Sequence, residues 1–118
     1  MMPCPIPKYL LPHTAVLTTE YAEDKWGHPK TEVTTLAVIR IEPCIKFAKT
    51  DEGTDVQLSA TLFFDCKNSL PSDVKFRLAG DDGCERQTVT FGGRKYVVGV
   101  IKPLYSGNRL HHYEVGLI

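Results

Sequence analysis

The sequence lacks an excess of charge of either sign, and it also lacks long apolar runs. Its 118 residues carry 14 Lys and Arg against 14 Asp and Glu, so the formal net charge is zero. Proteins that bind nucleic acid electrostatically usually carry a surplus of Lys and Arg, so this balance argues against that class. No window approaches the ~18 apolar residues of a membrane span. The proline-rich start MMPCPIPKYLLPH also has no apolar segment of the secretory type. We therefore expect neither export nor a membrane partner.

The motifs of common enzyme and metal sites are missing as well. The four cysteines, Cys4, Cys44, Cys66 and Cys84, include no C-x-x-C pair, which argues against zinc and favours reduced thiols. The sequence contains no GxSxG, no Walker A loop and no GxGxxG. We therefore expect no enzymatic activity, no catalytic residue, no metal and no cofactor.

The adjacent pair His111-His112 is the strongest candidate for metal binding. Neighbours on a strand point to opposite faces, so we expect that the two rings cannot chelate one metal together. A partly buried histidine beside a surface histidine is the expected arrangement.

The composition that remains is that of one globular domain. Hydrophobic residues make up 42% and charged residues 24% of a chain whose length leaves no room for two domains. We expect a single domain over residues 1–118, in which residues 1–12 form an extended N-terminal arm.

Apolar residues alternate with period two, which is typical of half-buried antiparallel strands. The clearest alternation covers Val56–Phe64, and a second covers Glu32–Glu42. In the second we expect one shared face, formed by Val33, Thr35, Ala37, Ile39 and Ile41. Leu36 and Val38 make the other face partly apolar too, as in a strand that curves around a barrel.

Weaker strand patterns cover four further segments: His13–Tyr21, Thr88–Phe91, Arg94–Ile101 and Leu110–Leu117. The Gly92-Gly93 pair predicts a tight hairpin between two of them. No convincing helical period is longer than about eight residues. The sequence therefore predicts an all-β fold: a small antiparallel β-barrel, SH3-like or related, of six to seven strands, with little helix and one long projecting loop.

The predicted loop is Lys46–Asp55, which is longer than a hairpin connection requires. It is either a solvated surface loop or a projecting interaction element. The residues that would act in the second case are Lys46, Lys49, Asp51, Glu52 and Asp55. The single tryptophan, Trp26, lies in a polar turn and would be either an interface anchor or a plug of the barrel.

Several segments in order resemble the minor capsid protein family of tailed phages and prophages of Gram-positive bacteria. They are PIPKYLLPHTAVL, DKWGHPKTEV, AVIRIEPC, LSATLFFDCKNSLP and the closing FGGRKYVVGVIKPLYSGNRLHHYEVGL. The stretch Arg77–Gln87 matches this family least well.

The resemblance implies a head-completion or head-to-tail connector subunit, made in the bacterial cytoplasm and located at the head–tail junction of the virion. Such proteins look like small β-barrels that form a ring of six or twelve copies below the portal. The implied partners are further copies of the chain, a portal or adaptor protein, a tail-completion protein and the packaged double-stranded DNA. In that group a long loop between two strands enters the channel and helps retain DNA, and Lys46–Asp55 has the corresponding position here.

A single-stranded nucleic-acid-binding barrel is the alternative interpretation, because small barrels bind such ligands through aromatic platforms and basic grooves. Most aromatic residues here lie on apolar strand faces, and no cluster of Lys and Arg adjoins them.

Overall fold

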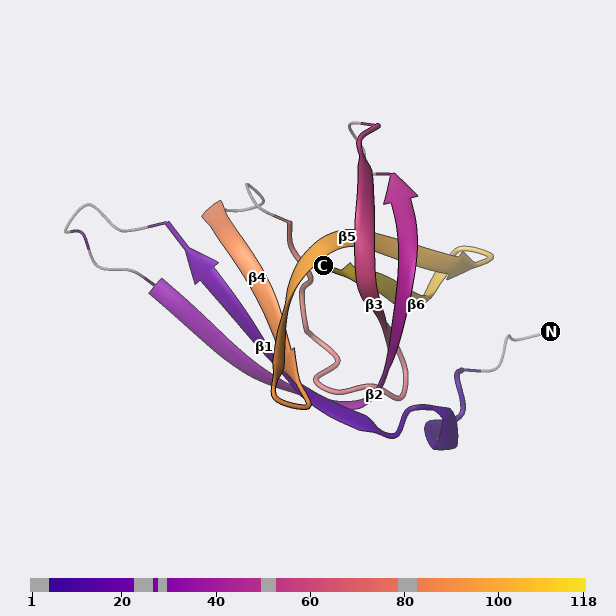
Figure 1. The fold of residues 1–118 in the computed structure, drawn as a ribbon. Coiled ribbons are helices and arrows are strands. Elements are labelled where there is room, and N and C mark those ends of the chain that lie inside the picture. Colours follow the sequence, from indigo (N-terminus) through magenta and orange to yellow (C-terminus); the bar gives the residue numbers. More distant parts are fainter. Residues whose placement is uncertain (1–4, 23–26, 28–29, 50–52, 79–82) are drawn as a thin grey trace.

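Six antiparallel strands form a closed barrel in the computed structural model, which describes residues 5–22, 27, 30–49, 53–78 and 83–118 (Figure 1). A short 3₁₀ turn, η1 (Lys8–Leu10), precedes them. The strands are β1 (His13–Tyr21), β2 (Lys30–Lys49), β3 (Asp55–Asp65), β4 (Cys84–Phe91), β5 (Arg94–Ser106) and β6 (Arg109–Leu117). Around the barrel their order is β1-β2-β3-β6-β5-β4. The predicted all-β barrel is therefore confirmed. Within the described ranges no helix has the length and hydrophobicity needed to cross a lipid bilayer.

The core consists of the inward-facing residues of all six strands. In β3, Leu58, Ala60, Leu62 and Phe64 are buried, as the alternation predicted. Residues on the other strands complete this core: Ala15, Leu17, Leu36, Ile39, Ile41, Val89, Tyr96, Val98, Val115 and Leu117.

The predicted shared face of β2 is wrong in its first half. Leu36 is buried, whereas Val33 is 66% exposed, and of the predicted set only Ile39 and Ile41 are buried. Val38 between them has a positive φ of 56°, and the register with β1 shifts at the same place. The extra residue of this β-bulge reverses the alternation, because each added residue turns the following side chains to the other face.

The segment between β3 and β4 packs against the part of β4 that no longer pairs with β5, since that pairing ends at Thr88 and Val97. The buried amide of Gln87 donates to the Lys75 carbonyl at 3.0 Å and accepts the Arg77 N–H at 2.8 Å. Phe76 from this segment makes edge contacts with Phe64 and Tyr113. The stretch Arg77–Gln87, which matched the family least well, is thus tied together at its two ends by the hydrogen bond between Arg77 and Gln87. Its residues 79–82 lie outside the described ranges.

Candidate assembly surface

The far half of the β2–β3 hairpin forms an arm, which we define as residues 46–49 and 55–58. Within it Lys46 lies opposite Leu58, and Lys49 lies opposite Asp55. Pairing of β1 with β2 ends at Ile39, and pairing of β6 with β3 starts at Ala60. The arm therefore extends beyond the barrel as a two-stranded ribbon (Figure 1).

The segment Lys46–Asp55 projects, but it is not a loop over its whole length. Lys46–Lys49 continues β2, and Asp55 begins β3. Local polarity misled the prediction, because a ribbon that is exposed on one face accommodates polar residues while its backbone pairs normally. Only residues 50–54 connect the two strands.

The structure places three of the five predicted loop residues. Lys46 and Lys49 are exposed on β2, and Asp55 is exposed at the start of β3. Asp51 and Glu52 lie outside the described residues, as does Trp26, so the roles assigned to them stay predictions.

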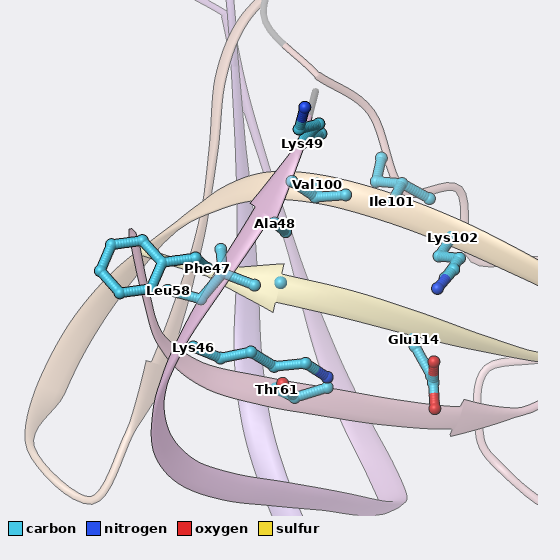
Figure 2. A pocket seen from close by; sticks show the side chains of 11 residues that line it. Lys46, Phe47, Ala48, Lys49, Leu58, Thr61, Val100, Ile101, Lys102 and Glu114 are labelled. Carbon is cyan, nitrogen blue, oxygen red and sulfur yellow. The ribbon is translucent and has the colours of Figure 1, made fainter. Parts of the chain in front are cut away.

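A groove of about 350 Å³ separates the arm from the sheet of β5 and β6 (Figure 2). Its apolar lining includes Leu58, Val100 and Ile101, and Lys46 lies along its edge. At the base of the arm, a Cβ atom on Gly116 would lie 2.7 Å from Leu58 Cδ1. Glycine at this position lets Leu58 pack directly on β6, which fixes the arm at its root.

Two large apolar side chains of β2 are exposed, one within the arm and one just before it. Ile45 is 75% and Phe47 is 71% exposed. Neither was predicted from the sequence, because the polar residues around them indicated a loop. The alternation Ile45-Lys46-Phe47 is the signal that could have identified a strand there. Exposed aromatic and aliphatic residues on a projecting ribbon are typical of a protein interface.

The two adjacent histidines do not point apart as predicted. His111 Nδ1 lies 2.8 Å from His112 Nδ1, and both rings are half-buried. The β5–β6 register shifts between Leu104 and Tyr105, which leaves His111 as an extra residue and lets the two rings turn toward one another. Burial, and then the neighbouring His111, lower the pKa of His112 below its ordinary value of 6.5, against the opposing effects of Glu114 and Asp65.

Among the described residues, no three His, Cys, Asp or Glu side chains are grouped so that they could hold a metal ion. What the structure presents instead is a closed barrel with one projecting ribbon and exposed apolar residues on it. A family model described as "Minor capsid protein" matches residues 7–117. The chain belongs to the minor capsid protein family. No curated protein and no solved structure matches it significantly.

Membership in the minor capsid protein family gives the chain a structural role in a phage virion. Membership in a capsid protein family implies that the chain assembles with other virion proteins. The family is structural and not known as enzymatic.

Proposed function

We propose that this minor capsid protein is a head-completion or head-to-tail connector subunit, which forms a ring below the portal and helps retain packaged DNA. The observation that carries the proposal is the arm, which extends from a closed barrel. Lys49 of β2 and Asp55 of β3 are its last pair of opposed strand residues. The barrel supplies a rigid body for packing between subunits, and the arm supplies an element that can reach into a central channel.

The charge of the protein is consistent with this role. A protein that retains DNA in the head must contact the DNA without binding it strongly, because strong attraction to phosphate would oppose DNA ejection. The chain as a whole has no net charge, and Asp55 lies beside Lys49 on the described part of the arm. Contact between arm and DNA would therefore be steric more than electrostatic.

Shortening the arm tests this function. Deleting Ala48 and Lys49 together with Asp55 and Val56 removes two paired positions from each strand. The connecting residues remain, and the side-chain alternation is preserved. We expect heads to assemble but to lose DNA, with about tenfold fewer filled particles by electron microscopy and by packaged-DNA assay.

The matched control removes the same number of residues from the end of the β5–β6 hairpin, namely Tyr105, Ser106, Arg109 and Leu110. Circular dichroism of both proteins checks that each variant folds. A normal yield of DNA-filled, infectious particles from the arm deletion would contradict the proposal.

A further inference from the structure

The arm has two strand edges without a partner among the described residues. β2 beyond Ile39 pairs only with β3, and β3 before Ala60 pairs only with β2. Backbone groups on both outer edges therefore face outward over the same stretch, residues 46–49 and 55–58. Such edges are templates for a further strand.

A two-stranded ribbon of this kind is only marginally stable in water by itself. The arm buries Leu58 against β6 but leaves the side chain of Phe47 exposed. Charged side chains, above all lysine, are a usual protection of an exposed edge, as are bulges, prolines and inward-pointing charges. The β2 edge carries Lys46 and Lys49, which oppose pairing with another β2 edge but not with an edge that carries an acidic residue. The strand positions 46–49 and 55–58 contain no proline, and the register shift in β2 lies before them, between Pro43 and Lys46.

We propose that the arms of neighbouring copies pair edge to edge, β2 of one copy with β3 of the next, in one continuous antiparallel sheet. The inference rests on the proposed ring. Rotation about a ring axis leaves the direction of every arm along that axis unchanged, so for arms that run along the axis β2 and β3 of adjacent copies meet antiparallel, as they do within one arm. The contact is heterologous, because two different edges of the chain meet.

The charges on the two edges of the arm favour a second copy of the chain as the partner, and they favour one register of the pairing. The β2 edge carries Lys46 and Lys49, whereas the β3 edge carries Asp55. Within one arm Lys49 lies opposite Asp55, and rotation about the ring axis preserves the height of each residue. Lys49 of one copy then lies beside Asp55 of the next, and Phe47 lies beside the next copy's Gln57. Opposite charges facing one another across strands are favourable, whereas pairing of two β2 edges would place lysines together.

Disulfide trapping tests this pairing directly. Phe47→Cys and Gln57→Cys are made in separate chains, each with Cys44→Ser to remove an exposed native thiol. Directly opposed residues of antiparallel strands have Cα atoms ~4.5–5.5 Å apart, within the range that a disulfide bridges. Because each chain carries only one new cysteine, a 47–57 disulfide can form only between copies.

The two variants are expressed together in place of the wild-type gene, and purified particles are oxidised and analysed by peptide mass spectrometry. We expect a 47–57 linked dimer as the main product, and none when either variant is expressed alone. Val33→Cys with Val97→Cys, two exposed strand positions outside the arm, is the matched control and should yield no dimer. Particles that contain both arm variants without a 47–57 dimer would overturn the inference while leaving the ring intact. If wild-type particles lacked the protein at the head–tail junction, the proposed function and the inference would fall together.

If the cysteine variants are not incorporated into particles, an exchange of charges between the two edges tests the pairing instead. Lys49→Asp and Asp55→Lys should each lower incorporation into particles about tenfold. Equal co-expression should restore it, because the aspartate introduced at position 49 of one chain then meets the lysine introduced at position 55 of the other at alternate contacts. Incorporation that stays as low in the mixture as in the single variants would overturn the inference, because repulsion within one arm is not relieved by mixing.

Discussion

The buried carboxylate of Asp65 accepts the backbone N–H of Ile6 at 3.1 Å, across 59 positions of the sequence. Its other oxygen accepts the N–H groups of Lys67 at 3.1 Å and Asn68 at 2.7 Å. Asn68 in turn donates its side-chain amide to the Ile6 carbonyl at 2.8 Å. One side chain at the end of β3 thus joins the N-terminal segment to the turn that follows the strand.

Replacing this carboxylate should destabilise the whole domain. We expect Asp65→Ala to lower the free energy of unfolding by about 2–4 kcal/mol, because three partly buried N–H groups lose a charged acceptor. Urea unfolding followed by tryptophan fluorescence or circular dichroism measures it. Asp73→Ala, at an exposed position, is the control and should change stability by less than about 0.5 kcal/mol. Equal effects of the two substitutions would show that the Asp65 network contributes nothing.

Val38 should tolerate glycine, unlike an ordinary strand valine. Its φ of 56° is strained for a β-branched residue, and the strain is worth about 1–2 kcal/mol. Relief of this strain should offset the loss of its half-buried side chain, so we expect Val38→Gly to lie within about 0.5 kcal/mol of wild type. Val16→Gly removes an equally half-buried valine from β1 and should cost about 2 kcal/mol. Thermal unfolding of both variants tests the difference, and an equally large loss in each would contradict it.

Gly116 and Leu58 should be energetically coupled. Gly116→Ala places a methyl group against Leu58, so we expect a loss of about 1–3 kcal/mol. Leu58→Ala alone should cost about 2–4 kcal/mol, and the double variant should lose clearly less than the sum. Gly99→Ala is the control: its new methyl group is close only to the side chain of Ile118, which is 47% exposed and can move aside, while the Gly116 carbonyl oxygen lies at an ordinary contact distance of 3.6 Å. Strictly additive losses in the double-mutant cycle would show that the two residues are not in contact.

His112 should make stability rise with pH. The folded-state pKa of His112 lies below its value in the unfolded chain, so the unfolded state binds more protons as the pH falls through 6.5. Stability is therefore lost as the pH decreases below about 6.5. We expect His112→Gln to reduce this slope in urea titrations between pH 7 and pH 5.

A direct reading of the same effect comes from NMR titration of the ring protons. His112 should titrate below 6.5, and His111→Gln should move its pKa upward, since the electrostatic effect of His111 on His112 is removed while burial remains. A His112 pKa at or above 6.5 in the wild-type protein would refute the assignment.

Phe47 should matter to assembly and not to folding. Its side chain is 71% exposed, so we expect Phe47→Ser to change the free energy of unfolding by less than about 0.5 kcal/mol. Incorporation into particles, measured by immunoblot of purified virions, should decrease severalfold. Phe64→Ser, at a buried position, should instead unfold the domain. Normal incorporation of Phe47→Ser would show that the arm makes no apolar contact in the virion.

The sequence by itself was sufficient to predict the fold class, the antiparallel strands and the inner face of β3. These follow from side-chain periodicity and turn chemistry, which are local properties of the chain. The strand β1 was predicted with its observed bounds, His13–Tyr21. The family could be inferred as well, because it depends on ordered segments of sequence and not on geometry.

Only the tertiary structure decided where that periodicity breaks and how far the strands extend. The bulge at Val38 is held by contacts from distant residues: Ser69 donates its hydroxyl to the Val38 carbonyl, and Ala37 pairs with Leu70. The meeting of His111 and His112 depends on a register shift between two strands, and the arm depends on β2 pairing with β3 beyond the barrel. Each of these features is a pairing between parts of the chain that no local pattern records, because register and bulges are set by the neighbouring strand.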